Sequence, residues 1–296
     1  MADIKLFQIK PEVKELTASS VALERELQTL LEQNMQTFFG ITFLKSEYAI
    51  TNGRIDSIGI DENNCPVIIE YKRSVSENVI NQGLFYLDWL LDHKADFKLL
   101  VIEALGMDKA NEIDWSIPCV ICVANDFTKY DVHAVNQMQK NILLIRYKMF
   151  TDDLILLEQI NAPNVAPMKD TSTSSNGRAS YKTFEEQLGT ASPKIKQLYE
   201  GLHDYIMSLG DDISENRLKL YVAYKKIRNV VCLEIRAKSI LAHLRLSPSD
   251  VELVEGFCRD TSNIGTWGTG DVEVTIKDEA DFARAKDYIL KAYQMN

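Results

Sequence analysis

The sequence lacks the features that mark secreted proteins, membrane-spanning proteins and proteins that coat nucleic acid. Only five of its 296 residues are cysteines, an odd and scattered set that argues against a disulfide scaffold and fits a reducing compartment. No apolar run approaches the roughly 18 residues that span a bilayer, so we expect no membrane helix. The first residues lack the apolar segment of a secretory signal. These absences predict a cytoplasmic protein.

Excess positive charge is also missing, because the formal net charge is −10 at pH 7. This charge excludes binding to nucleic acid by bulk electrostatics alone. The charge is unevenly distributed. Residues 1–160 hold 15 Lys and Arg against 24 Asp and Glu, whereas residues 161–296 hold 18 against 19. Residues 217–245 hold eight basic residues against one acidic residue, a local excess of +7. This basic stretch predicts a positive surface in the second half of the chain.

The pair Cys119 and Cys122 forms a C-x-x-C motif, which occurs in zinc and redox sites. Its neighbours in residues 117–124 are almost all apolar, and no second C-x-x-C or close pair of histidines completes a zinc site. We therefore interpret both cysteines as small buried residues of a strand.

A stretch rich in Ser, Thr, Asn and Pro separates two regions of ordinary globular composition. It covers residues 161–182 and has no apolar period, which is typical of a flexible linker. The sequence therefore predicts a first domain at residues 1–160 and a second at residues 183–296.

Apolar periodicity in the first domain predicts a core in the order α-β-β-β-α-β, hence an α/β fold with a mixed sheet flanked by helices. The expected helices cover residues 21–38, 77–93 and 128–139. The expected strands cover residues 47–51, 54–61, 66–73, 98–103, 118–124, 141–149 and 154–160.

The second domain is predicted to be a smaller α+β module. Helices are expected at residues 193–209, from residue 249, and at 279–293. Strands are expected at residues 218–227, 230–236, 239–245 and 271–276.

Two strand-like runs in the first domain are joined by a turn-forming segment at residues 61–64, which predicts a β-hairpin centred near residue 63. Asp56 and Glu70 lie seven residues on either side of that centre. In an antiparallel ladder they are opposite each other on one face, with Cβ atoms about 5 Å apart. Lys72 shares that face because side chains alternate along a strand.

Two adjacent carboxylates repel each other, and a hard divalent cation removes that cost. Oxygen ligands of this kind suit Mg²⁺ or Mn²⁺. A metal-bound water has a lowered pKa, and Lys72 would neutralise phosphate charge or help to orient the water. The set therefore matches hydrolysis of a phosphodiester bond. On spacing alone, a salt-bridged surface hairpin explains the same three residues equally well.

Two further features lie on the predicted helices. Gln82 and Tyr86 are four residues apart and share one face of the helix that follows the hairpin. Glu24 shares a side of the first helix with Leu27, Gln28 and Leu31, so its carboxylate can lie at the edge of the core. Taken by itself, a glutamate at such a position is more often simply solvated.

These motifs resemble those of a nuclease family. The run Glu24-Arg-Glu-Leu27 resembles the first-helix motif of archaeal Holliday-junction resolvases and of the NucS/DUF91 group. The runs Gly53-Arg-Ile-Asp56 and Glu70-Tyr-Lys72 are similar to the G-R-I-D and E-x-K motifs of that group, and Gln82 with Tyr86 resembles the Q-x-x-x-Y motif of RecB-type nucleases. One departure is Ile55, which replaces the proline that precedes the first acid in the PD-(D/E)XK pattern.

The resemblance covers roughly residues 20–125 and implies a restriction-endonuclease-like fold. It implies Glu24, Asp56 and Glu70 as metal ligands and Lys72 as the catalytic lysine. Gln82 and Tyr86 would support the site or contact substrate.

The C-terminal half resembles DUF5655, a small domain of unknown function. The resemblance rests on residues 220–225, 240–246 and 268–274, and it implies no activity. The basic stretch leaves two interpretations open. In one, a tyrosine stacks on a base and Lys225, Lys226 and Arg228 contact phosphates. In the other, the tyrosines pack in the core and the charges are solvated.

The sequence thus predicts a Mg²⁺- or Mn²⁺-dependent endonuclease, acting on DNA rather than RNA, in DNA repair or in defence against foreign DNA. Arg54 and Arg73, beside the hairpin motifs, are further candidates for nucleic-acid contact. The alternatives are a module that binds nucleic acid without cleaving it and a regulatory interaction protein. A homodimer, or a protein partner contacted through the second domain, is also expected.

Overall fold

A computed structural model describes residues 4–19, 24–72, 78–151, 153–163, 165, 167–168 and 182–296. The chain folds into two compact units. Unit 1 comprises Met1–Gly59, Val67–Ala110 and Cys119–Asn161, and unit 2 comprises Ile60–Pro66, Asn111–Pro118 and Ala162–Asn296. The main division therefore falls at residue 161. Most of the predicted linker lies outside the described residues.

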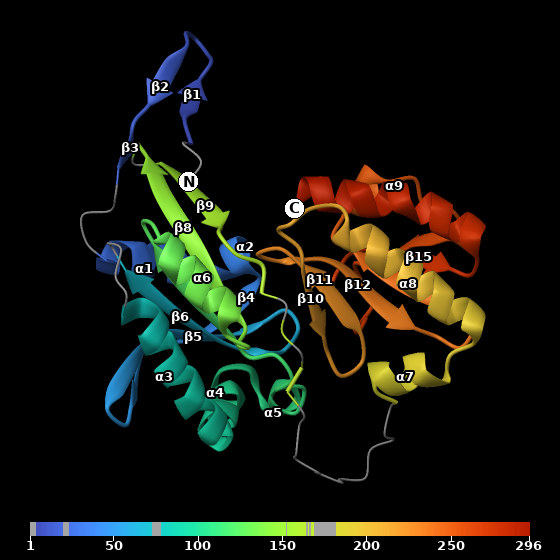
Figure 1. The fold of residues 1–296 in the computed structure, drawn as a ribbon, viewed down its shortest axis with the longest axis horizontal. Coiled ribbons are helices and arrows are strands. Elements are labelled where there is room, and N and C mark those ends of the chain that lie inside the picture. Colours follow the sequence, from blue (N-terminus) through green and yellow to red (C-terminus); the bar gives the residue numbers. More distant parts are fainter. Residues whose placement is uncertain are drawn as a thin grey trace. The chain divides into compact units, whose positions relative to one another are not determined.

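Unit 1 is built on a seven-stranded sheet flanked by helices (Figure 1). Its strands are β3 (Ala18–Ser19), β4 (Ile41–Ile50), β5 (Gly53–Asp61), β6 (Pro66–Lys72), β7 (Cys119–Ala124), β8 (Ile142–Phe150) and β9 (Leu154–Gln159). They are ordered β3-β8-β7-β6-β5-β4, with β9 also paired to β8. Pairing is parallel between β6, β7 and β8 and antiparallel between β8 and β9, so the predicted mixed sheet is confirmed. A separate two-stranded sheet joins β1 (Leu6–Gln8) to β2 (Lys14–Leu16).

The described helices of unit 1 contribute buried apolar side chains to its core. They are α1 (Glu24–Gln33), α2 (Met35–Phe39), α3 (Asn78–Asp92), α4 (Lys94–Leu105), α5 (Met107–Ala110) and α6 (Lys129–Gln137). Helix α3 packs closely against β7. The approach is so close that a Cβ atom added at Gly83 would lie 2.5 Å from Val120 Cγ1. Helix α3 follows the β5–β6 hairpin in the chain, so this packing positions the helix beside the hairpin.

Two predictions for unit 1 are corrected. The expected strand at residues 98–103 is part of helix α4, because a short apolar run does not by its period distinguish a buried strand from a helix. In α4 only Phe97 and Val101 are buried, and Leu99 is exposed. The single helix expected at residues 21–38 is two helices in its described part, α1 and α2, with Asn34 between them.

Unit 2 is a six-stranded antiparallel sheet with helices packed on one face (Figure 1). The strands are β10 (Ser214–Arg217), β11 (Val222–Lys225), β12 (Asn229–Ile235), β13 (Ile240–Leu244), β14 (Cys258–Asp260) and β15 (Val272–Ile276), ordered β10-β11-β12-β13-β15-β14. The helices are α7 (Phe184–Thr190), α8 (Pro193–Met207) and α9 (Glu279–Met295). Their apolar faces form one core with the sheet, in which Leu202, Leu233 and Ile289 are fully buried.

The predicted α+β module is therefore confirmed, with differences in its elements. The helix expected from Ser249 is wrong, since this segment is only a 3-10 turn over Pro248–Asp250. The sequence analysis missed α7, β10 and β14. All three are short, and β10 (Ser-Glu-Asn-Arg) has no apolar side chain that would signal a strand.

The basic stretch at residues 217–245 does not form the continuous positive surface that its charge predicts. Lys225 is 5% exposed and its Nζ lies 3.3 Å from Asp61 Oδ2 within unit 2. Lys226 pairs with Asp212 at 3.2 Å. Burial lowers the pKa of Arg228, and Arg245 lowers it further. Lys225 is therefore too buried to belong to the predicted nucleic-acid-binding surface. Contact of Lys226 or Arg228 with nucleic acid stays a prediction.

Both tyrosines of the basic stretch are buried, Tyr221 at 7% exposure and Tyr224 at 0%. This favours the interpretation in which they pack in the core. All five cysteines are free and buried, and Cys119 and Cys122 lie in β7 as predicted. No helix in the described ranges is long and apolar enough to cross a membrane.

Candidate active site

The β5–β6 hairpin places the predicted acidic residues. Its turn is closed by a hydrogen bond from Asp61 N to Cys65 O at 2.9 Å, and Asn64 takes the left-handed conformation with φ 64°. Asn tolerates this conformation better than most residues. The turn therefore fixes the register of the two strands.

This register brings Asp56 and Glu70 together. The backbone N–H of Asp56 donates to Glu70 Oε1 at 3.1 Å, and the backbone N–H of Tyr71 donates to Asp56 Oδ2 at 3.1 Å. Glu70 is 1% exposed and Asp56 is half-buried. The two strands lie inside the sheet, because β4 flanks β5 and β7 flanks β6.

The pair is electrostatically strained. Burial, and then the charge of Asp56, raise the pKa of Glu70 from 4.5 to about 9. Burial also raises the pKa of Asp56, although the Tyr71 N–H and Lys72 oppose that rise. At neutral pH the site therefore favours a proton or a cation between the two carboxyl groups.

Lys72 lies next to this pair, as strand alternation predicts. Its Nζ is 3.2 Å from Glu24 Oε1, and 23% of its side chain is exposed. Burial alone would lower the pKa of Lys72, but Glu24, Asp56 and Glu70 raise it above its usual value. Lys72 is thus held in its charged form. Glu24, in the first turn of α1, is placed as the partner of this lysine.

The donor set of the hairpin fits a hard divalent cation. Within the described part of the chain, no group of three or more His, Cys, Asp and Glu side chains is arranged to hold a metal. The two carboxyl groups that could hold a cation here are those of Asp56 and Glu70, and Mg²⁺ commonly binds proteins through one or two carboxylates together with water. The role of Glu24 as a third ligand stays a prediction.

Gln82 and Tyr86 share one face of helix α3 close to the hairpin. Tyr86 is 7% exposed, and burial followed by the charges of Glu70 and Asp56 raises its pKa. The Oε1 atom of Gln82 is buried and makes no hydrogen bond to the described residues. Tyr86 is therefore held near the acidic pair, and the catalytic roles of Gln82 and Tyr86 stay predictions.

We expect Gly53→Ala to destabilise the protein and disturb the site. A Cβ at Gly53 would lie 2.8 Å from Tyr86 Cε1, so the buried ring has to shift. Overpacking of this kind costs about 1–3 kcal/mol in the free energy of unfolding, measured by urea denaturation. Gly265→Ala is the control, because a Cβ there meets no atom within 4 Å. Equal stability of the two variants would contradict this packing.

Several polar residues behind the hairpin were missed by the sequence analysis as site residues. Gln28 Nε2 donates to the backbone oxygen of Asp56 at 3.0 Å, and Ser57 Oγ donates to Glu32 Oε1 at 2.6 Å. Glu24, Gln28 and Glu32 recur every four residues along α1. That period is the signal that could have identified this polar face.

Of the two arginines beside the hairpin motifs, the structure describes only Arg54. The Arg54 side chain is 64% exposed, and its Nε lies 2.5 Å from Glu47 Oε2. The Arg54 guanidinium is therefore accessible to a phosphate. Contact between Arg54 and nucleic acid stays a prediction. Arg73 lies outside the described residues.

Comparison with known proteins identifies the family. An uncharacterised protein of Haemophilus influenzae is 34% identical over 284 residues, which are 93% of this chain and 94% of that protein. The chain belongs to the same family. Within it, residues 23–104 match the endonuclease NucS C-terminal domain and residues 184–296 match the domain of unknown function DUF5655. The resemblances to the NucS group and to DUF5655 that were drawn from the sequence motifs are thus confirmed.

Two solved structures match about half of the chain. One is a repair endonuclease from Pyrococcus abyssi, with 16% identity over 47% of this chain and 59% of that chain, and a TM-score of 0.29. The other is a complex of EndoMS with double-stranded DNA, with 20% identity over 48% of this chain and 59% of that chain, and a TM-score of 0.27.

Proposed function

We propose that this protein is a Mg²⁺- or Mn²⁺-dependent endonuclease that hydrolyses phosphodiester bonds in DNA, in the cytoplasm, in repair or in defence against foreign DNA. The observation that carries the proposal is the pair of half-buried Asp56 and buried Glu70 with Lys72 beside it. A purely structural hairpin gains nothing from two neighbouring carboxyl groups whose burial raises the pKa of one to about 9. The NucS-type domain supports the same chemistry.

Each residue of the site has a distinct part in this mechanism. Asp56 and Glu70 would hold the cation, which when bound lowers the pKa of a water and polarises the phosphate. Lys72 would stabilise the negative charge that develops on the phosphate. Glu24 keeps the Lys72 ammonium in place through their 3.2 Å ion pair. Tyr86 packs against the hairpin at Gly53 and so limits the movement of the strand that carries Asp56.

A regulatory interaction protein remains the second candidate. The observation in its favour is the charge of residues 1–160, 15 basic against 24 acidic residues, which is unfavourable for any protein that must approach phosphates. A bound divalent cation would offset part of this charge at the site, so the nuclease is the better-supported proposal.

The full chain should cut DNA only when a divalent cation is present. We would incubate it with supercoiled plasmid and with branched, flapped, mismatched and single-stranded DNA and RNA, in EDTA, Mg²⁺ or Mn²⁺. We expect nicking or cleavage of at least one DNA with Mg²⁺ or Mn²⁺, and none in EDTA. Asp56→Asn, which keeps an acceptor for the Tyr71 N–H, is the matched inactive variant. Wild-type protein that binds these substrates but cuts none of them would favour a module that binds nucleic acid without cleaving it, and protein that neither binds nor cuts them would favour the regulatory interaction protein.

A further inference from the structure

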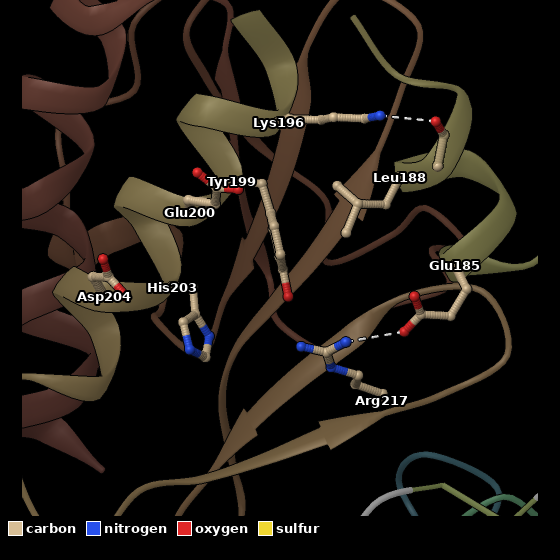
Figure 2. Close-up of a pocket in the computed structure, with 9 residues that line it drawn as sticks. Glu185, Leu188, Lys196, Tyr199, Glu200, His203, Asp204 and Arg217 are labelled. Atoms are coloured by element: carbon tan, nitrogen blue, oxygen red, sulfur yellow. Dashed lines mark hydrogen bonds and ion pairs between the residues drawn. The ribbon is translucent and has the colours of Figure 1, made fainter. Parts of the chain in front are cut away.

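Unit 2 contains a cavity of about 540 Å³ that the nuclease chemistry does not use. It lies between α7, α8 and β10, a region to which the DUF5655 match assigns no activity. Its volume is within the range of about 300–1,000 Å³ that is usual for small-molecule sites. The side chains that define its chemistry are Glu185, Leu188, Lys196, Tyr199, His203 and Arg217 (Figure 2).

The middle of the cavity is an apolar slot. Figure 2 shows the ring of Tyr199 on α8 and the side chain of Leu188 on α7 on opposite sides of it. The Tyr199 ring is 5% exposed and is held by an edge contact with Phe184, with ring centroids 5.5 Å apart. The small exposed part of Tyr199, opposite an aliphatic side chain, suits a flat apolar ligand group.

A buried carboxylate organises one end of this slot. Glu215 is 8% exposed and accepts hydrogen bonds from Tyr199 Oη at 3.2 Å and Arg217 Nε at 2.9 Å. The His203 Nδ1 atom lies 3.8 Å from the same oxygen and 3.0 Å from the hydroxyl of Tyr224. Burial, and then the charge of Glu215, raise the pKa of Tyr199 to about 12, so its phenol stays protonated and donates. This network fixes the side chains that face the cavity before any ligand arrives.

That end of the cavity presents a donor and an acceptor side by side. Arg217 Nη1 lies 3.1 Å from Glu185 Oε1. In the described part of the chain, the second terminal nitrogen of Arg217 and the second oxygen of Glu185 make no hydrogen bond, so both can contact a ligand. Adjacent donors and acceptors match the edge of a nucleobase, which carries both kinds of group.

Lys196 supplies a positive charge at the other end of the cavity, and Glu200 lies one turn further along α8 in the same lining. Lys196 lies there, away from Arg217 (Figure 2), and its Nζ donates to the backbone oxygen of Gly189 at 2.8 Å. An ammonium group has two further N–H donors for a ligand anion. A Cβ added at Gly189 would meet no atom within 4 Å, so this end is open.

We propose that this cavity binds a nucleotide. The base lies between Tyr199 and Leu188 with its polar edge on Arg217 and Glu185, and the phosphate lies near Lys196. The order of polar end, apolar slot and cation along the cavity matches the order of polar base edge, base ring and phosphate in a nucleoside monophosphate. The proposal is independent of the nuclease activity, because it uses only side chains of unit 2.

Isothermal titration calorimetry on the full chain in EDTA tests this site. The ligands are AMP, GMP, CMP and UMP, with ribose 5-phosphate and inorganic phosphate as probes that lack a base. We expect saturable binding of at least one nucleotide with a Kd of about 1 mM or tighter, and binding of the two probes at least about tenfold weaker. If no nucleotide binds, or if ribose 5-phosphate binds as tightly as the nucleotides, the proposal is overturned.

Variants locate the ligand. Leu188→Trp fills the slot and should abolish binding, while circular dichroism checks that the fold is kept. Arg217→Gln should weaken binding about tenfold or more. Lys196→Gln should weaken a nucleotide but not its nucleoside, and Lys194→Gln, an exposed lysine on the same helix outside the cavity, should change neither. Folded Leu188→Trp protein that binds as well as wild type would place the ligand elsewhere and reject the site.

Discussion

Lys72→Ala should lower metal-dependent cleavage of DNA by about a hundredfold to a thousandfold, the loss typical when one charge-stabilising group is removed from an active site. The side chain is 23% exposed and makes its ion pair with Glu24 rather than with the core, so the fold should be kept. The loss should appear in kcat more than in KM, because the charge that Lys72 neutralises develops in the transition state. Single-turnover cleavage of a labelled DNA measures it directly.

Lys45→Ala is the matched control for this experiment. Lys45 is an exposed lysine on the neighbouring strand β4, and its removal should change cleavage by less than about twofold if only local charge at the site matters. A Lys72→Ala enzyme with unchanged kcat would remove Lys72 from the mechanism. A similar loss in both variants would indicate a general electrostatic effect on DNA binding.

Glu70→Gln should abolish metal-dependent cleavage and at the same time stabilise the metal-free protein at pH 8. Burial beside Asp56 raises the pKa of Glu70 from 4.5 to about 9. The folded protein therefore holds this proton at pH values where the unfolded chain has released it. Stability accordingly falls as the pH rises from 4.5 towards 9, and is unaffected by this group below 4.5. Glutamine has no proton to release, so the variant should avoid this loss.

The expected gain in the free energy of unfolding is on the order of 1–3 kcal/mol at pH 8, and it should disappear near pH 4. Urea denaturation of both proteins in EDTA at the two pH values measures it. Mg²⁺ or Mn²⁺ should raise the stability of wild type at pH 8 but not that of Glu70→Gln. Glu103→Gln, at an exposed position of α4, is the control. A variant that is less stable than wild type at pH 8 would show that Glu70 is a structural residue.

The acidic pair is determined largely by the sequence, because local chemistry sets it. A turn at residues 61–65 fixes the register of two short strands, and a register fixes which side chains are opposite each other. Asp56, Glu70 and Lys72 therefore come together without any long-range information. The family motifs at Gly53–Asp56 and Glu70–Lys72 lie on this same hairpin, so the nuclease resemblance and the geometry depend on the same residues.

Elements whose identity depends on packing could not be predicted in this way. The apolar run at residues 98–103 is compatible with either a strand or a helix. Only the packing of these residues in unit 1 determines that they form part of helix α4. The three polar residues of α1 that lie behind the hairpin show a clear period. The contacts of Gln28 with Asp56 and of Glu32 with Ser57, however, join residues more than 20 positions apart in the chain.

The charges of unit 2 show most clearly what tertiary structure decides. The sequence determines a local excess of +7 at residues 217–245, but not where each charge lies. Lys225 can be buried because the carboxylate of Asp61 neutralises its charge. Arg217 is held by Glu215 at the edge of a cavity, and no sequence motif indicates that this cavity exists. A buried charge requires a partner, and the partner usually comes from a distant part of the chain. The sequence alone therefore determined the acidic hairpin and the order of the two NucS-like and DUF5655-like regions, whereas the partners of the remaining charges were decided only by the folded structure.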